Sequence, residues 1–311
     1  MTDQQKKPLI VIVGPTAAGK TSVSIALAER LNGEIVSADS RLLYRGMNIG
    51  TAKPTIEEQG DIPHHLIDVA DPDETWSLAV YQRAAYKEID AIHERGKLPF
   101  LVGGTGQYVR SILEGWHIPP QGPDPALRAA LNQWADKIGA EGLHHRLARL
   151  DPLAADKIDY RNLRRTVRAI EVIFCTGERF SDLRKRQQCR YAPLVLGIAR
   201  GRETLYERID LRIDQMLTDG LVAEIQGLLD AGYHGDLPTM SAIGYAELIQ
   251  YLQGETSYDE AVSLIRRNTR IFVRRQTNWF KPEDDRIHWI EADEEMVVEM
   301  ETLIRRWLND L

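Results

Sequence analysis

The feature that most constrains the fold is a glycine-rich motif close to the start of the chain. Residues Gly14 to Thr21 match the phosphate-loop pattern G-x-x-x-x-G-K-[ST] in full. The apolar, β-branched run from Leu9 to Val13 predicts a buried strand before the motif. Helically spaced apolar residues from Ser22 to Leu31 predict a helix after it. A strand, a glycine loop and a helix in this order are typical of a parallel α/β sheet that binds phosphate.

The chemistry of the loop predicts a grip for two linked phosphates. Its glycines let backbone N–H groups close around phosphate oxygens, and the helix N-terminus adds a favourable dipole. We expect Lys20 to neutralise the phosphates and the Thr21 hydroxyl to hold Mg²⁺. The predicted binding residues are Gly14, Pro15, Thr16, Ala17, Ala18, Gly19, Lys20 and Thr21. The alternative is a glycine turn that binds no ligand.

Strands and helices alternate through the first third of the chain. Ile35 to Ala38 and Leu98 to Val102 are short apolar runs that predict strands, and Ser77 to Arg95 has a helical pattern closed by Gly96. A later apolar run, Leu194 to Ile198, predicts a strand that returns to the same sheet. The pattern favours an α/β fold, a parallel sheet flanked by helices like that of P-loop NTPases.

A proline-rich stretch marks a change of character after residue 115. Pro119, Pro120, Gly122, Pro123 and Pro125 predict a linker, and the pattern is helical from Arg128 to about Arg186. We therefore expect a discontinuous catalytic core of residues 1–115 and 192–311, with residues 116–191 as an inserted all-helical domain. Helices from Arg202 to Phe280, a strand at Ile287 to Ile290 and a terminal helix complete the core.

An acidic residue follows the second predicted strand, where a general base or a metal-supporting group would lie. Asp39 stands between the hydroxyls of Ser37 and Ser40. Proteins that hydrolyse nucleoside triphosphates usually end a later strand in a metal-supporting Asp. Here Leu98 to Val102 runs instead into Gly-Gly-Thr. A carboxylate in a phosphate cleft can accept a proton; a helix cap or a support for Mg²⁺ is the alternative for Asp39.

Composition excludes some classes of protein and singles out two basic segments. No apolar run approaches the length of a membrane span, and Cys175 and Cys189 suggest neither a disulfide framework nor a zinc site. We expect a cytoplasmic protein. The net charge is -7, yet residues 161–190 hold nine Arg and Lys against three acids, and residues 266–281 hold six against none. These segments indicate a localised polyanion footprint, or else solvated helix faces with acids opposite.

Several motifs together resemble one enzyme family, the bacterial tRNA dimethylallyltransferases. The phosphate loop is similar to the family's GPTASGKT, with Ala18 in place of its usual Ser. The block from Asp39 to Pro54, which contains Tyr-Arg-Gly-Met-Asn-Ile-Gly-Thr-Ala-Lys-Pro, resembles the family's most specific stretch. The residues Val102 to Gly106, Ile243 to Tyr245 and Thr269 to Phe280 complete the set in order.

The resemblance implies roles for particular residues. It implies that Asp39 is the general base, that Thr105 lies beside the reacting centre, and that Arg212, in the pattern Arg-Ile-Asp-Leu-Arg, grips the diphosphate. The implied tRNA contacts are Asp39, Ser40, Arg41, Leu42, Thr105, Arg128, Arg164, Arg165, Arg168, Ser241, Gly244, Tyr245, Arg274, Arg275, Gln276, Trp279 and Lys281.

The resemblance also implies a reaction and its partners. A dimethylallyl group would pass from dimethylallyl diphosphate to N6 of adenosine-37, 3′ to the anticodon, in tRNAs that read codons beginning with U. The implied cofactor is Mg²⁺, the macromolecular partner is the tRNA anticodon stem-loop, and we expect a monomer without membrane contact. Other hypotheses are an isopentenyltransferase acting on free adenylate, a phosphate-loop kinase, and a non-catalytic, nucleotide-gated RNA-binding protein.

Overall fold

A six-stranded parallel sheet forms the centre of the fold. The structure is a computed structural model that describes residues 6–118, 122, 124–183 and 188–311. The strand order is β3-β2-β4-β1-β5-β6, and all five pairings between these strands are parallel. The strands are β1 (Pro8–Val13), β2 (Gly33–Ser37), β3 (His64–His65), β4 (Leu98–Val102), β5 (Ala192–Ala199) and β6 (Ile287–Glu291). β1 lies in the middle, so the phosphate loop leaves the sheet between two neighbouring strands.

Thirteen helices lie within the described residues. They are α1 (Lys20–Arg30), α2 (Ile56–Gln59), α3 (Leu78–Glu94), α4 (Gly106–Leu113), α5 (Pro125–Leu150), α6 (Pro152–Lys157), α7 (Leu163–Thr176), α8 (Phe180–Leu183), α9 (Arg202–Thr218), α10 (Leu221–Asp230), α11 (Tyr245–Leu252), α12 (Tyr258–Gln276) and α13 (Met296–Asn309). In this part of the chain no helix is both long enough and apolar enough to cross a membrane.

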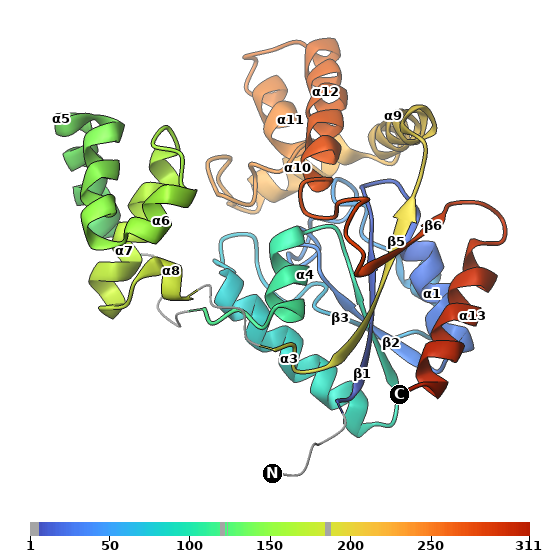
Figure 1. The fold of residues 1–311 in the computed structure, drawn as a ribbon. Coiled ribbons are helices and arrows are strands. Elements are labelled where there is room, and N and C mark those ends of the chain that lie inside the picture. Colours follow the sequence, from blue (N-terminus) through green and yellow to red (C-terminus); the bar gives the residue numbers. More distant parts are fainter. Residues whose placement is uncertain (1–5, 119–121, 123, 184–187) are drawn as a thin grey trace, which may run out of the picture. The chain divides into compact units, whose positions relative to one another are not determined.

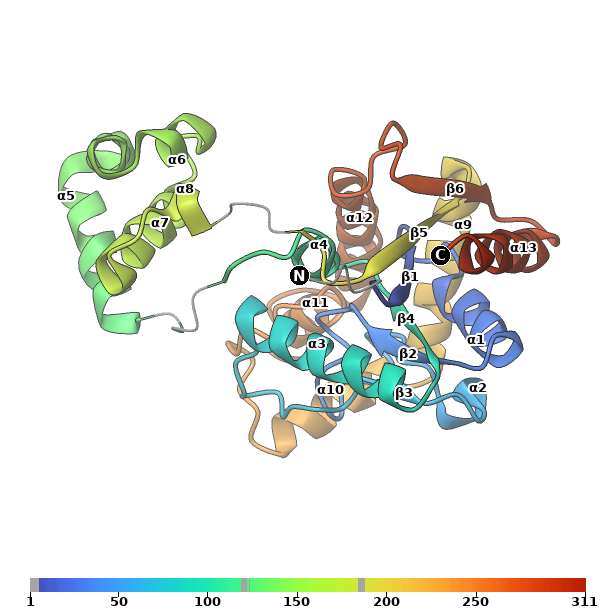
Figure 2. The ribbon, with the colours of Figure 1, turned by 60° about the horizontal axis from the view of Figure 1, so that its bottom comes forward.

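Helices cover both faces of the sheet, which explains why its three central strands, β4, β1 and β5, are almost uniformly apolar. Figure 2 shows α1 and α13 on one face and α3 and α4 on the other. The core on the first side joins β1 to helix side chains such as Leu27 of α1 and Met300 of α13. Figure 1 shows a further layer, α9 to α12, beyond the carboxyl ends of the strands. In parallel α/β sheets, ligands bind at this edge.

The main elements predicted from the sequence are present. The strands expected at Leu98 to Val102, Leu194 to Ile198 and Ile287 to Ile290 correspond to β4, β5 and β6, which confirms the expectation of a sheet re-entered late in the chain. The helix expected from Ser22 begins two residues earlier, at Lys20, directly after the phosphate loop. β3 and α2 were not predicted, because two and four residues are too short to show a period.

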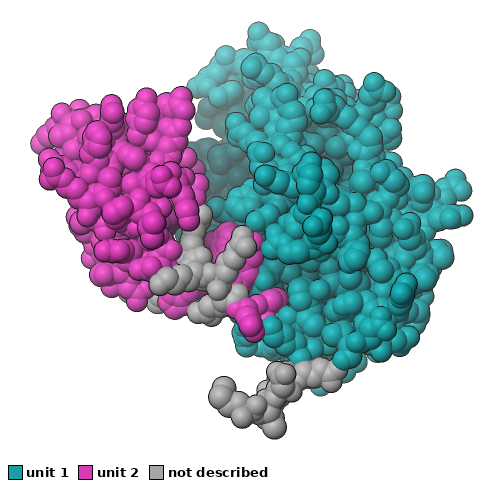
Figure 3. All heavy atoms as spheres, in the orientation of Figure 1, with its two compact units in different colours: residues 1–76, 82–113, 190–311 teal, residues 77–81, 114–189 magenta. Residues whose placement is uncertain are grey.

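The chain divides into two compact units, coloured separately in Figure 3. Unit 1 comprises residues 1–76, 82–113 and 190–311, and unit 2 comprises residues 77–81 and 114–189. Unit 2 is helical and has its own core, which contains Leu143, Leu147 and Ile170. α5 is broken at Gly139, whose φ of 79° is not helical. The linker prolines 119, 120 and 123, and the end of the helical pattern near Arg186, lie outside the described residues.

Candidate active site

The phosphate loop turns sharply between β1 and α1. Gly19, with a φ of 107°, is the residue before α1 and supplies no side-chain cap, and the first turn of the helix carries no acid. The loop also holds Ala17 at a φ of 66°, in the left-handed region that costs energy for a residue with a Cβ. The N–H groups at this helix start are therefore not capped by their own sequence, which suits an anion.

Two cationic side chains, Lys20 and Arg208, donate to carbonyl groups of the loop. The Lys20 ammonium donates to the carbonyls of Gly14 at 3.1 Å and Pro15 at 2.9 Å. Arg208 of α9 donates through Nε to the carbonyl of Ala17 at 3.0 Å. Both cations therefore lie against the phosphate loop. The sequence analysis did not predict this contact of Arg208.

Asp39 and Thr105 are brought together by the pairing of β2 with β4. Ser37 lies opposite Val102 in the register, so the residues that follow the two strands are neighbours. The Ser40 N–H donates to the Thr105 hydroxyl at 3.0 Å, and the Arg41 N–H donates to Asp39 Oδ1 at 2.9 Å. A Cβ added at Gly103 would lie 2.2 Å from the carbonyl oxygen of Ala38, so only glycine permits this approach.

Two cations and one carboxylate influence each other at this edge of the sheet. Burial lowers the pKa of the Lys20 ammonium to about 8; the Asp39 carboxylate opposes this shift and Arg212 reinforces it. Burial also lowers the pKa of the Arg212 guanidinium, again opposed by Asp39. Cations held near one another and partly desolvated favour an anion between them. Lys20, Asp39 and Arg212, which are the candidates for diphosphate binding and proton transfer, therefore share one electrostatic environment.

Gln276, which the resemblance implies is a tRNA contact, is buried between two loops of this site. Its Oε1 accepts from the backbone N–H of Thr16 at 2.8 Å, and its Nε2 donates to the carbonyl of Gly104 at 3.3 Å. The side chain is 5% exposed. The last residue of α12 thus ties the phosphate loop to the loop that carries Thr105. Its role toward tRNA stays a prediction.

We expect Gln276→Met to weaken the binding of diphosphate about tenfold. The substitution keeps the approximate volume but leaves the Thr16 N–H and the Gly104 carbonyl without their partner, and an unpaired buried polar group costs about 1–3 kcal/mol. Calorimetric titration with inorganic diphosphate measures the effect. Thr277→Val, one residue further on at an exposed position, serves as the control. Unchanged affinity in Gln276→Met would show that the loops keep their geometry without this bridge.

The other predicted tRNA contacts of unit 1 differ in exposure. Arg274, Arg275, Ser241 and Lys281 are exposed, Trp279 is half-buried, and Tyr245 and Gly244 are buried. Ser40, Arg41 and Leu42 are half-buried around Asp39. Trp279 packs so closely on α4 that a Cβ at Gly106 would lie 2.1 Å from its ring.

The basic segment from Arg266 to Lys281 is partly neutralised by α9, which corrects the picture of a segment with no balancing acid. Arg266 pairs with Asp214, and Arg270 pairs with Asp210. Among the described residues, the exposed side chains of Arg267, Arg274 and Arg275 make no hydrogen bond or ion pair. Two of these three unpaired arginines, Arg274 and Arg275, lie in the last turn of α12.

In unit 2, two predicted tRNA contacts converge on one buried acid. Arg128 donates to Glu171 at 2.9 Å, and Arg168 pairs with the same carboxylate at 2.6 Å. These two bonds lower the pKa of Glu171, against the effect of its burial. Arg164 is exposed and Arg165 is half-buried at the start of α7. Arg164 and Arg165 are thus the members of this set that the rest of the described unit leaves available.

Comparison with known proteins agrees with the geometry. The family model described as IPP transferase matches residues 42–283, and a model described as isopentenyl transferase matches residues 7–67. A tRNA dimethylallyltransferase from Roseiflexus sp. (strain RS-1) is 47% identical over 302 residues, which cover 97% of this chain and 99% of that protein.

Solved structures match over nearly the whole chain. The full-length tRNA isopentenylpyrophosphate transferase from Bacillus halodurans is 40% identical with a TM-score of 0.74, and the match covers 98% of each chain. A eukaryotic dimethylallyltransferase, described as acting on tRNA, matches with a TM-score of 0.83 over 98% of this chain and 80% of that one. Its identity of 24% shows a shared fold. With the parallel sheet and phosphate loop described above, these matches confirm the predicted fold, and the chain belongs to the IPP transferase family.

Proposed function

We propose that this protein transfers the dimethylallyl group of dimethylallyl diphosphate to N6 of adenosine-37 in tRNAs that read codons beginning with U. The observation that carries the proposal is the shared environment of Lys20, Arg212 and Asp39 at the carboxyl edge of the sheet, two cations for a diphosphate and one carboxylate for a proton. Relatives that match nearly the whole chain are named tRNA dimethylallyltransferase and tRNA isopentenylpyrophosphate transferase, which supports the transfer to tRNA.

The proposed reaction breaks one bond and forms another. The allylic C–O bond cleaves as its electron pair moves to the diphosphate, whose growing negative charge is met by the loop N–H groups, Lys20 and Arg212. The adenine amino nitrogen attacks the allylic carbon, and Asp39 accepts the proton that the amino group loses. Thr105, fixed by the Ser40 N–H, lies beside Asp39 on the neighbouring loop.

The residues at the loop fit a magnesium ion held mainly by substrate. Thr21 is exposed at the start of α1, and the described residues hold no group of three or more His, Cys, Asp or Glu that could bind a metal. Mg²⁺ commonly takes one or two protein ligands together with phosphate oxygens and waters. The Thr21 hydroxyl would hold the ion against the diphosphate, where the ion supplies charge neutralisation to the leaving group.

One assay distinguishes this proposal from its competitors. The protein is incubated with labelled dimethylallyl diphosphate and either an unmodified anticodon stem-loop or AMP. We expect label in the adenosine of the RNA and little in AMP. Equal labelling of AMP would favour an adenylate isopentenyltransferase, and transfer of phosphate from ATP would favour a kinase. Tight RNA binding without any transfer would favour a non-catalytic RNA-binding protein.

The exposed end of α12 gives a prediction about RNA binding. Arg274→Ala combined with Arg275→Ala should weaken stem-loop binding and reduce the slope of log K against log salt by about 0.7–0.9 per lost phosphate contact. Diphosphate affinity should barely change. Binding measured by fluorescence anisotropy at several salt concentrations tests this.

The matched control removes two adjacent arginines from α13, which flanks the sheet. Arg305→Ala with Arg306→Ala changes the net charge equally, so a general electrostatic effect would appear in both double variants. If the two variants show the same salt slope, the end of α12 is a solvated helix face rather than an RNA contact.

A further inference from the structure

The segment Tyr44–Pro54, part of the stretch most specific to the family, has no role in the chemistry described so far. It leaves the Asp39 loop and runs beneath α10 and α11 as a chain of turns without a strand or an α-helix. The carbonyl of Thr51, in the second half of the segment, accepts from Nη2 of Arg212 at 3.4 Å. A segment of irregular backbone therefore contacts the cation that is proposed to grip the diphosphate.

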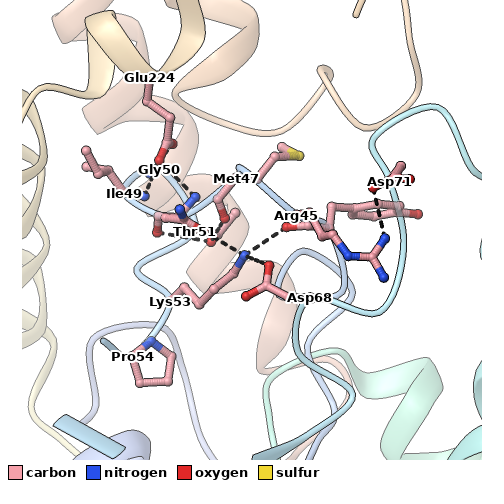
Figure 4. Close-up of polar contacts among 12 residues, drawn as sticks. Arg45, Met47, Ile49, Gly50, Thr51, Lys53, Pro54, Asp68, Asp71 and Glu224 are labelled. Carbon is pink, nitrogen blue, oxygen red and sulfur yellow. Dashed lines mark hydrogen bonds and ion pairs between the residues drawn. The ribbon is translucent and has the colours of Figure 1, made fainter. Parts of the chain in front are cut away.

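One carboxylate accepts hydrogen bonds from the turn that precedes Thr51. Glu224, in the first turn of α10, accepts from three consecutive backbone N–H groups: Asn48 at 2.9 Å, Ile49 at 2.7 Å and Gly50 at 3.2 Å. It also accepts from the Tyr245 hydroxyl at 2.6 Å. Figure 4 shows the carboxylate facing Ile49 and Gly50. Successive N–H groups that point to one place form an anion-binding nest, and four donors fill the usual capacity of a carboxylate.

The far side of the same turn is closed by a buried cation. The Lys53 ammonium, whose side chain is 5% exposed, donates to the carbonyl of Tyr44 and to Oδ1 of Asn48, each at 2.8 Å, and pairs with Asp68. Figure 4 shows this ammonium reaching back across the turn. With Glu224 on one side and Lys53 on the other, the turn has little freedom to reorient.

Packing adds a steric restraint at the residue next to Thr51. A Cβ at Gly50 would lie 2.4 Å from the Tyr245 ring and 2.8 Å from the Leu221 side chain. The turn is thus pressed against α10 and α11 as well as hydrogen-bonded to Glu224. The position of the Thr51 carbonyl follows from these contacts, because the peptide that bears it joins directly to the clamped residues.

We propose that Glu224 is a positioning residue, which fixes the Thr51 carbonyl and through it directs the Arg212 guanidinium toward the diphosphate. The inference rests on the proposed function for the identity of the ligand. Arg212 is half-buried near Lys20, and repulsion between the two cations would turn a free guanidinium away from the site. The anchored carbonyl opposes that movement before any ligand arrives.

A double-mutant cycle tests whether Glu224 acts through Arg212. Glu224→Gln places an amide N–H₂ where the turn needs an acceptor and removes the charge. We expect it to raise the Kd of inorganic diphosphate about tenfold, as for one lost charge-assisted hydrogen bond. In an Arg212→Ala background the same substitution should change the Kd less than twofold. In turnover, the KM for dimethylallyl diphosphate should rise more than kcat falls, and stem-loop affinity should stay within twofold.

Controls separate positioning from general destabilisation. Glu247→Gln alters another buried carboxylate, which caps α11 by accepting from the Gly244 N–H and is not bonded to the turn, and it should leave the diphosphate Kd unchanged. If Glu224→Gln does not fold, as judged by circular dichroism, Glu224→Asp in the same cycle replaces it, since it keeps the charge and shortens the reach. Equal effects of the Glu224 substitution with and without Arg212 would overturn the inference.

Failure of the inference and failure of the proposed function give different results. The cycle uses inorganic diphosphate and needs no transfer reaction. A wild-type protein that prenylates RNA but shows an additive cycle would retain the function and lose the role of Glu224. A wild-type protein that transfers nothing would lose the function, whereas the cycle would still report on Glu224 and Arg212.

Discussion

Replacing Asp39 with alanine is expected to lower the turnover number about 10²-fold or more, the range that general acid–base catalysis commonly provides. The adenine amino group is a poor nucleophile until it loses a proton, and Asp39 is the carboxylate that shares the environment of Lys20 and Arg212. The measurement is single-turnover transfer to an anticodon stem-loop at saturating dimethylallyl diphosphate. Stem-loop affinity should change little.

Asp39→Asn separates proton transfer from loop geometry. The asparagine oxygen can still accept from the Arg41 N–H, as Oδ1 of Asp39 does at 2.9 Å, but the side chain cannot take up a proton. We expect this variant to be nearly as slow as the alanine variant. Near-normal turnover in Asp39→Asn would assign the residue to shaping the loop rather than to accepting the proton.

The second large effect concerns Lys20. Lys20→Ala should weaken diphosphate binding about 10²-fold, because it removes a desolvated cation aimed at the site where charge accumulates. Thr21→Ala should weaken binding chiefly when Mg²⁺ is present. Calorimetric titration with inorganic diphosphate, with and without Mg²⁺, measures the affinity of both variants. Lys87→Ala, on the exposed face of α3, is the control for net charge.

The lowered pKa of Lys20 adds a direction to this prediction. Since the ammonium loses its proton near pH 8 and only the charged form attracts the anion, wild-type affinity should fall as pH rises above about 8. The same pKa shift has the opposite effect on the pH dependence of folding stability. The unfolded chain holds the proton up to about pH 10.5, so in the ligand-free protein this contribution rises with pH between those values. Lys20→Ala should remove both trends, and ionisation of the ligand cancels in the comparison.

Patterns of local residues were sufficient for the central part of the fold. The phosphate loop was predicted from its motif, the strand before it from an apolar run, and the helix after it from helically spaced apolar residues. β4, β5 and β6 were predicted from apolar runs. Asp39 and Thr105 could be placed at one edge, because parallel strands end on the same side of a sheet.

The contacts that assemble the site could not be inferred in this way. Gln276 meets Thr16 across 260 positions, and Glu224 meets Ile49 across 175. No spacing rule reports such a contact, since it depends on how α9 to α12 fold back over the strand ends. The same return of the chain brings Asp210 and Asp214 beside Arg270 and Arg266, which sequence counting left unbalanced.

The central position of β1 has a consequence for the order in which the protein can fold during synthesis. β1 pairs with β4 on one side, but its other partner, β5, begins at Ala192, after the whole of unit 2 has been made. Until β5 has been made, the emerging chain can form only part of the sheet, with β1 as an open edge strand. An open edge strand can pair with other chains. Unit 2 has a core of its own to bury in that interval. Arg212, which contacts Thr51, and Gln276, which contacts the phosphate loop, are made later still. A nascent chain therefore lacks these contacts of the diphosphate site until most of its length has emerged.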